Sequence, residues 1–233
     1  MADAEENPMK KPEPASPLVR GLLASLALLV ASPTFAEVEV GITTDMAEFE
    51  VRHGDERVMV TRDQDTFATI DLDYAQIARP CPPFCIQPMS LGRGVETLGE
   101  LEFIDYLRQT TERDDLLIID SRTPREYRRG TIPGAINIPW DRLHFASGAD
   151  PDDVRNVLSD RFDVVFDGDF YDFSHAKTLV LFCNGPWCGQ SPTNIRTLTN
   201  LGYPAERIKW YRGGMQMWHA FGLTTVEGSS AKD

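Results

Sequence analysis

Cys183 and Cys188, separated by four residues, are the side chains in this sequence best placed for chemistry. The apolar run at 178–182 is too short for a helix and is typical of a buried parallel strand, and Cys183 follows it directly. Ser191 and Pro192 form an N-cap and first-turn pair, so a helix is predicted to begin there. A thiol between a strand and a helix N-terminus lies near unpaired N–H groups and a partial positive charge, which stabilise a thiolate. The pattern therefore predicts that Cys183 is a nucleophile.

The other cysteines each have two interpretations. Cys188 either resolves an oxidised form of Cys183 by forming a disulfide, or closes the loop as a structural staple. Cys81 and Cys85 lie in the proline-rich stretch 79–92, which excludes a regular helix or a central strand. We expect a structural disulfide there. The functional alternative is that this loop covers the active site and exchanges disulfides with Cys183.

The cysteine spacing does not indicate a metal site. Three and four residues separate the members of the two pairs, and neither pair has the two-residue spacing of familiar zinc knuckles. The histidines are scattered without ligand spacing: His53, His144, His175 and His219. We therefore expect no metal and no other cofactor.

Strands alternate with short helices along the second half of the chain. Apolar runs predict strands at 116–119, 136–139 and 208–211, in addition to the strand before Cys183. A capping-box pattern and an apolar stripe predict a helix at 97–107. This alternation is typical of an α/β fold with an open parallel sheet flanked by helices. Ligands bind beyond the carboxyl ends of such strands, which is where Cys183 is expected.

The first 36 residues have the pattern of a polar extension followed by a signal peptide. Lys10, Lys11 and Arg20 precede the apolar stretch 21–31, which is too short to span a bilayer comfortably, and small residues end the segment at Ala36. We expect cleavage there, export to the bacterial periplasm and no stable membrane insertion afterwards.

Residues 37–94 are predicted to be a β-rich accessory segment that ends in the cysteine–proline loop. Residues 38–42 alternate between apolar and polar, and 58–61 has the pattern of the return strand of a hairpin. The remaining expected parts are a single α/β domain at 95–224 and a disordered tail at 225–233.

The charge balance argues against one class of partner. The formal net charge is −13 and the pI is about 4.7, so long-range attraction of nucleic acids or of an anionic membrane surface is disfavoured. We expect no nucleic acid partner, although a local positive pocket is compatible with this balance.

Several separate motifs follow one another within residues 95–224. They are Asp120-Ser121-Arg122 with Glu126-Tyr127, the run GTIPGAINIP at 130–139, the strand that ends in Cys183, and Tyr211-Arg212-Gly213-Gly214 with Trp218. In this order they resemble the rhodanese-like family of sulfurtransferases. The combination of CPPFCIQP with FCNGPWCGQSP further resembles a bacterial exported subgroup of that family.

The resemblance implies that Cys183 is the nucleophile of a sulfur transfer. A thiolate attacks a sulfane sulfur, a persulfide forms, and a second thiol or cyanide removes the outer sulfur. The implied partner is a small sulfur-containing substrate or a thiol acceptor protein. Asp120 and Arg122 are expected to border the site, with Arg122 and Glu126 as a structural ion pair. The implied active-site loop contains Asn184, Gly185, Pro186, Trp187, Gly189, Gln190 and Ser191.

The loop departs from the common pattern of the family, in which an arginine follows the cysteine after four residues. No basic residue lies between Cys183 and Ser191, so an anionic donor such as thiosulfate loses its usual charge partner. We therefore expect inefficient turnover of thiosulfate, and the same absence argues against the phosphatases that share this fold. The alternative from another class is a non-catalytic binding module of the same fold whose cysteines form two structural disulfides.

Overall fold

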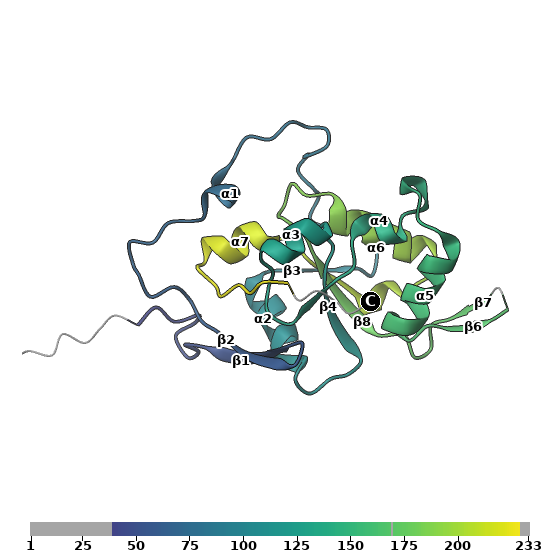
Figure 1. The fold of residues 1–233 in the computed structure, drawn as a ribbon, viewed down its shortest axis with the longest axis horizontal. Coiled ribbons are helices and arrows are strands. Elements are labelled where there is room, and N and C mark those ends of the chain that lie inside the picture. The colour runs from purple at the N-terminus through teal and green to yellow at the C-terminus, as the bar shows by residue number, and fades with distance from the viewer. Residues whose placement is uncertain (1–38, 169, 229–233) are drawn as a thin grey trace, which may run out of the picture. The chain divides into compact units, whose positions relative to one another are not determined.

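The computed structural model describes residues 39–168 and 170–228 and is built around a five-stranded parallel sheet (Figure 1). The strands are β3 (Glu96–Leu98), β4 (Leu116–Asp120), β5 (Ala135–Asn137), β8 (Thr178–Phe182) and β9 (Ile208–Tyr211). Their order is β3-β9-β8-β4-β5, so β8 is central and β3 and β5 lie at the edges. The predicted open parallel sheet of an α/β fold is confirmed.

Helices cover both faces of this sheet, because the central strand β8 carries apolar side chains on both of its faces. The helices are α1 (Leu72–Ala75), α2 (Glu100–Gln109), α3 (Pro124–Arg129), α4 (Trp140–Leu143), α5 (Pro151–Phe162), α6 (Gln190–Asn200) and α7 (Gly214–Ala220). In β8, Val180 and Phe182 belong to a hydrophobic cluster with α2 and α7. Leu179 and Leu181 point to the opposite cluster, which contains side chains of α5 and α6. Burial on both faces explains the continuous apolar run.

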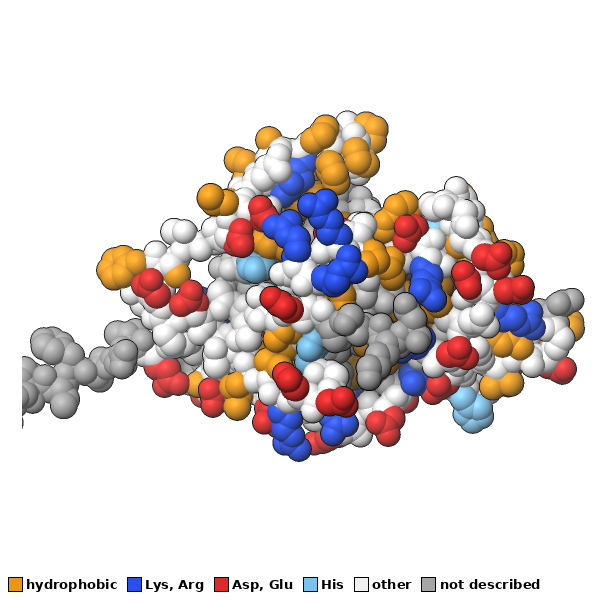
Figure 2. Space-filling model, viewed as in Figure 1, with side chains coloured by type: hydrophobic (Ala, Val, Ile, Leu, Met, Phe, Trp, Pro, Cys, Tyr) orange, Lys and Arg blue, Asp and Glu red, His pale blue; other side chains and the backbone are white. Residues whose placement is uncertain are grey.

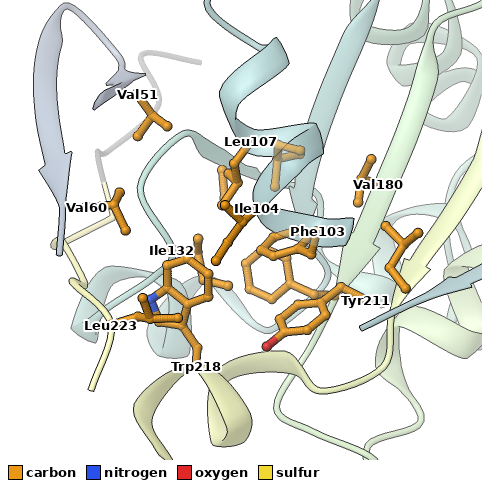
Figure 3. Packing of buried hydrophobic residues seen from close by; sticks show 14 of the residues in the cluster. Val51, Val60, Phe103, Ile104, Leu107, Ile132, Val180, Tyr211, Trp218 and Leu223 are labelled. Carbon is orange, nitrogen blue, oxygen red and sulfur yellow. The ribbon is translucent and has the colours of Figure 1, made fainter. Parts of the chain in front are cut away.

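Phe103 of α2 lies at the centre of the first cluster (Figure 3). Its ring stacks on Tyr211 with centroids 4.2 Å apart, and it packs edge-on with Phe182 and Trp218 at 5.9 and 5.8 Å. The side chain is fully buried. These contacts hold α2 and α7 against the strands that end at the carboxyl edge of the sheet.

An antiparallel hairpin extends the first cluster. It consists of β1 (Phe49–His53) and β2 (Glu56–Val60), joined by a two-residue turn at Gly54-Asp55. Val51 and Val60 are fully buried and face α2 (Figure 3). This part of the N-terminal segment therefore shares the core of the sheet.

The first strand of the hairpin differs from the prediction. Residues 39–42 are not a strand, and Phe49 is the residue that pairs with Val60. The tight turn explains this, because it places the strand directly before it opposite β2. A second short hairpin, β6 (Val165–Asp167) with β7 (Phe170–Asp172), follows α5.

The C-terminal end of the described chain is paired with the domain. Val226 and Thr131 exchange backbone hydrogen bonds of 2.8 and 3.1 Å, so residues 225–228 do not behave as the expected disordered tail. Backbone pairing requires no side-chain pattern, so residue order does not indicate it. Residues 229–233 and the predicted signal segment 1–36 lie outside the described residues. Within the described ranges, no helix has the length and apolar character needed to cross a bilayer.

Candidate active site

The loop between β8 and α6 carries both free thiols at the carboxyl edge of the sheet. Cys183 directly follows β8, and α6 begins at Gln190. The loop is also tied to the start of α7, because the N–H of Met215 donates to the Cys183 oxygen at 3.0 Å and the N–H of Gln216 donates to the Asn184 oxygen at 2.9 Å. The loop is thus fixed at the position where open α/β sheets bind ligands.

Gly214 allows α7 to approach the loop this closely. Its φ is +56°, and a Cβ at this position would lie 2.3 Å from the Cys183 carbonyl oxygen and 2.8 Å from the Gly185 nitrogen. Only glycine fits both the conformation and the space. Gly214 therefore lets the start of α7 pack directly against the backbone of Cys183 and Gly185.

Ser191 does not cap α6, so this prediction is wrong. The N-cap residue is Gly189, with no side-chain capping bond, and Ser191 lies within the first turn of the helix. Its hydroxyl group is buried and lies beside the Cys183 sulfur, where it helps to lower the pKa of that thiol. Ser191 therefore contributes to the surroundings of the Cys183 sulfur rather than to the cap of the helix.

The pKa of the Cys183 thiol is lowered even though only 2% of the residue is exposed. Burial alone would raise the pKa of its thiol, but hydrogen bonds to the sulfur from Cys188, Ser191 and the backbone of Gly185 outweigh burial and hold the pKa below its usual range. As a neutral thiol, its Sγ donates to the backbone oxygen of Cys188 at 3.6 Å.

Cys188 has the opposite tendency. Burial and the neighbouring Cys183 raise the pKa of the Cys188 thiol well above its usual range. Its S–H can donate to the Gln190 Oε1 at 3.3 Å or to the Cys183 sulfur. Both cysteines are free thiols, so the two-disulfide arrangement of the binding-module alternative is not the one found. The pKa of one thiol is thus lowered and that of the other is raised.

The cysteine–proline loop lies directly over this site. A disulfide joins Cys81 and Cys85, whose Cα atoms are 4.7 Å apart. Beyond it, the N–H of Gln87 donates to the Pro186 oxygen at 2.8 Å. Phe84 packs edge-on against Trp187, with ring centroids 5.6 Å apart. Hence the disulfide loop and the active-site loop form one packed unit, although about a hundred residues separate them.

A pocket of about 930 Å³ opens beside the two loops. Cys188 lines it together with Trp187, Gly189 and Gln190, whereas Cys183 is not among the lining residues. The walls also include Tyr74, Arg79, Glu126, Thr193, Arg196 and His219. A ligand therefore meets the Cys188 side of the loop first.

Asp120 and Arg122 pair with each other at the end of β4. The Arg122 Nη2 lies 2.6 Å from the Asp120 Oδ2, both side chains are buried, and the Thr131 hydroxyl donates to the same carboxylate at 2.8 Å. Arg122 also reaches the Tyr74 hydroxyl at 3.3 Å and lines the pocket. Asp120 supports the site from beneath and does not line the pocket.

The expected ion pair between Arg122 and Glu126 is wrong. Glu126 instead closes a capping box with Thr123 at the start of α3 and accepts a 2.7 Å hydrogen bond from the Asn184 Nδ2. Burial would raise the pKa of Glu126, but these hydrogen bonds and one from Gln190 lower it. Arg122 instead pairs with Asp120, two residues earlier, because its guanidinium group donates hydrogen bonds to that carboxylate.

Sequence reasoning missed the arginines that border the pocket. Arg79 comes from the N-terminal segment, and nothing local to it indicates this contact. The position of Arg196 could have been predicted from the sequence. Gln190, Thr193 and Arg196 recur every three residues along α6, and all three line the pocket. In the described part of the chain, no three His, Cys, Asp or Glu side chains are grouped as metal ligands.

The family comparison matches most of the domain. A model of the rhodanese-like domain family matches residues 103–221. An HTH-type transcriptional regulator of Mycobacterium tuberculosis is 28% identical over 123 residues, which are 53% of this chain and 43% of the regulator. The chain thus spans less than half the length of that curated relative.

Solved structures with related folds are more distant in sequence. The BH2092 protein of Bacillus halodurans is 18% identical with a TM-score of 0.40, covering 59% of this chain and 81% of that one. A thiosulfate sulfurtransferase of Pseudomonas aeruginosa is 20% identical with a TM-score of 0.39, covering 59% and 21%. A human single-domain sulfurtransferase is 22% identical with a TM-score of 0.35, covering 53% and 95%.

Proposed function

Because the chain belongs to the rhodanese-like domain family, we propose that it transfers sulfane sulfur through a persulfide on Cys183. The environment of this sulfur supports the proposal most directly, since Cys183 follows the central strand and receives hydrogen bonds that lower its pKa. The thiolate is the form of cysteine that attacks sulfane sulfur.

The proposed cycle has two balanced steps. The Cys183 thiolate attacks the outer sulfur of a donor R–S–SH, the donor S–S bond breaks, and R–S⁻ leaves. The product, Cys183–S–SH, is favoured as an anion by the same N–H and hydroxyl groups that favour the thiolate. A thiolate acceptor then attacks the outer sulfur and restores the Cys183 thiolate. Sulfane sulfur changes carrier without net oxidation or reduction.

Cys188 has the resolving role in this proposal. Its raised pKa keeps it protonated while Cys183 is a thiolate, so only one of the two sulfurs reacts with the donor. In the absence of an acceptor, Cys188 loses its proton and attacks the inner sulfur of the persulfide. A Cys183–Cys188 disulfide forms and hydrosulfide leaves, so the two cysteines are oxidised and the sulfane sulfur is reduced. External thiols then reduce the disulfide.

We further propose that the mature protein acts in the bacterial periplasm, as a member of an exported subgroup of the family. The Cys81–Cys85 disulfide supports this location, because persistent disulfides are typical of oxidising compartments. The partner is a small sulfur-containing substrate or a thiol acceptor protein. Cell fractionation with N-terminal sequencing checks the location, and we expect a mature chain that starts at Glu37 in the periplasmic fraction.

Peptide mapping after exposure to a sulfane donor tests the nucleophile. The wild-type protein should gain one sulfur atom on the peptide that contains Cys183, as measured by mass spectrometry. Cys188→Ser is the matched control, because it removes the second thiol of the same loop and should retain the added sulfur for longer. If Cys183→Ser acquires sulfur at the wild-type rate, the assignment is wrong.

A further inference from the structure

Arginines from separate parts of the chain converge on the pocket beside Cys188. Arg79, Arg122, Arg129 and Arg196 all line it. Figure 2 shows basic side chains gathered near the middle of this face, within a surface that is otherwise dotted with acidic groups. For a chain of net charge −13, such a gathering is a local exception.

Two of these arginines are already neutralised. Arg122 pairs with Asp120, and Arg129 pairs with Asp73. Arg79 and Arg196 form no ion pair with an acidic residue of the described chain. They are therefore the cations that remain available for a ligand.

Arg79 is held in place by the packing of the two loops. Its guanidinium carbon lies 3.7 Å from the centroid of the Trp187 ring, and its Nη1 donates to the Gln76 Oε1 at 2.7 Å. Its Nε is buried without a hydrogen-bond partner in the described residues. A fixed cation thus lies against the loop that carries Cys188.

Arg196 approaches from the helix that follows the same loop. Its Nη2 donates to the Thr193 hydroxyl at 3.2 Å, and Thr193 lies one turn from Gln190 on the face of α6 that lines the pocket. The loop between β8 and α6 therefore has a cation on the side of the disulfide loop and another on the side of the helix.

The acidic side chains of the pocket do not cancel these two cations. Asp73 is paired with Arg129, and Glu126 accepts hydrogen bonds from Asn184 and Gln190. Asp71 caps the start of α1 through the N–H of Asp73. Each of these carboxylates already has a partner of its own.

We propose that Arg79 and Arg196 form a subsite for the carboxylate of an organic thiol or persulfide that reacts in the adjacent loop. The subsite replaces the cation that is missing from the loop itself. A pocket of about 930 Å³ is far larger than an inorganic anion of a few atoms and lies in the range of roughly 300–1,000 Å³ typical of organic ligands. Phe84, Trp187 and Trp140 supply apolar walls. The thiol chemistry of the ligand rests on the proposed sulfur transfer, whereas the anion subsite does not.

Two alkylating agents of similar size but different charge test the subsite directly. Iodoacetate is an anion and iodoacetamide is neutral. The rate with iodoacetate divided by the rate with iodoacetamide at the loop cysteines therefore reports the local charge, because a difference in thiol pKa affects both rates equally. In the wild-type protein this ratio should exceed that of the same two reagents on an unstructured cysteine peptide. Arg79→Gln and Arg196→Gln should each lower the ratio by about threefold or more at low salt.

Matched variants separate charge from folding. Arg161→Gln removes an exposed arginine of α5 that does not line the pocket and should leave the ratio unchanged. Arg79→Lys keeps the charge and should retain most of the ratio, even where the packing on Trp187 is weakened. An unchanged ratio in both glutamine variants would overturn the subsite.

Persulfide donors of opposite charge identify the ligand class. Glutathione persulfide carries carboxylates and cysteamine persulfide carries an ammonium group, and sulfur loading of Cys183 should be faster from the first in wild type but not in Arg79→Gln. Loading at equal rates from both donors in the two proteins contradicts the subsite while leaving sulfur transfer intact. No loading from either donor, together with an arginine-dependent iodoacetate ratio, would refute sulfur transfer and leave the subsite standing.

Discussion

At the scale of single residues, the two sulfurs of the active-site loop are chemically unequal although both are buried. Cys183 is 2% exposed and Cys188 3%, so burial cannot distinguish them. Hydrogen bonds do, because Cys183 receives them from Ser191 and the backbone of Gly185, whereas Cys188 donates its own proton. The position of Cys183 between a strand and a helix predicted a lowered pKa for this thiol, but the sequence left the role of Cys188 open. The raised pKa of Cys188 could not be predicted, since it depends on groups that the fold brings around each sulfur.

The pH dependence of alkylation tests this inequality. A lowered pKa means that Cys183 stays reactive below the usual cysteine range and loses reactivity only as the pH falls through the lowered value. Cys188→Ala removes the S–H donor and should raise the midpoint by about one pH unit, because a hydrogen bond to a charged group contributes about 1.5–3 kcal/mol. Cys188→Ser keeps a donor and should shift it less. Iodoacetamide rates across pH provide the measurement, and an unmoved midpoint in Cys188→Ala would count against the hydrogen bond.

Glu126 illustrates a residue whose role the sequence could not reveal. The family resemblance implied an ion pair with Arg122, but Glu126 joins α3 to the active-site loop through Asn184. Glu126→Ala should lower the free energy of unfolding by about 1–2 kcal/mol, because a capping bond and a partly buried hydrogen bond are lost together. Urea unfolding measures this. Glu112→Ala, at an exposed position without a side-chain partner among the described residues, is the control and should change stability by less than about 0.5 kcal/mol. Equal losses in both variants would contradict the assigned contacts.

At the scale of elements, the sequence predicted the strands and helices whose patterns are local. The sequence was sufficient to predict β8 and α2. A strand that is buried on both faces has a continuous apolar run, and a helix that is buried on one face has an apolar residue every three or four positions. The start of α6 was predicted two residues late, since Gly189 rather than Ser191 holds the N-cap. The first strand of the hairpin was missed because its partner, β2, decides which upstream residues pair.

Phe103 is the residue through which α2 stabilises the sheet. Phe103→Ala should destabilise the protein by about 3–5 kcal/mol, because it removes a buried ring packed against three aromatic neighbours. Leu101→Ala, in the same helix but 49% exposed, is the matched control and should cost less than about 1 kcal/mol. Chemical unfolding of both variants measures the difference, and similar losses would contradict the central position of Phe103.

At the scale of the whole described chain, the N-terminal segment completes the site rather than standing apart from it. Gln87 bonds to Pro186, Phe84 packs on Trp187, and the Gln216 side chain donates to the Tyr74 oxygen at 3.1 Å. None of these contacts has a local sequence signal, because each joins positions about a hundred or more residues apart. The sequence therefore predicted the sheet and the place of Cys183 at the end of its central strand, but not the walls of the pocket.

Removal of the disulfide tests this dependence. In Cys81→Ser/Cys85→Ser, the loop should release Phe84 and Arg79 from Trp187, so backbone amides at 183–189 should exchange hydrogen several-fold faster. Hydrogen exchange with mass spectrometry measures this peptide by peptide. The α5 peptide, 151–162, serves as the internal control and should not change. Unchanged exchange at 183–189 would show that the disulfide loop does not hold the active-site loop.

The most direct test of the central claim follows one labelled sulfur through a single turnover. The protein is loaded from a donor whose outer sulfur is sulfur-34, separated from the donor, and then mixed with a thiol acceptor. Sulfur transfer through Cys183 predicts that the label appears first on the Cys183 peptide and then in the acceptor persulfide, with the Cys183 thiol regenerated. A label that reaches the acceptor at the same rate in Cys183→Ser, or never resides on the Cys183 peptide, would contradict it.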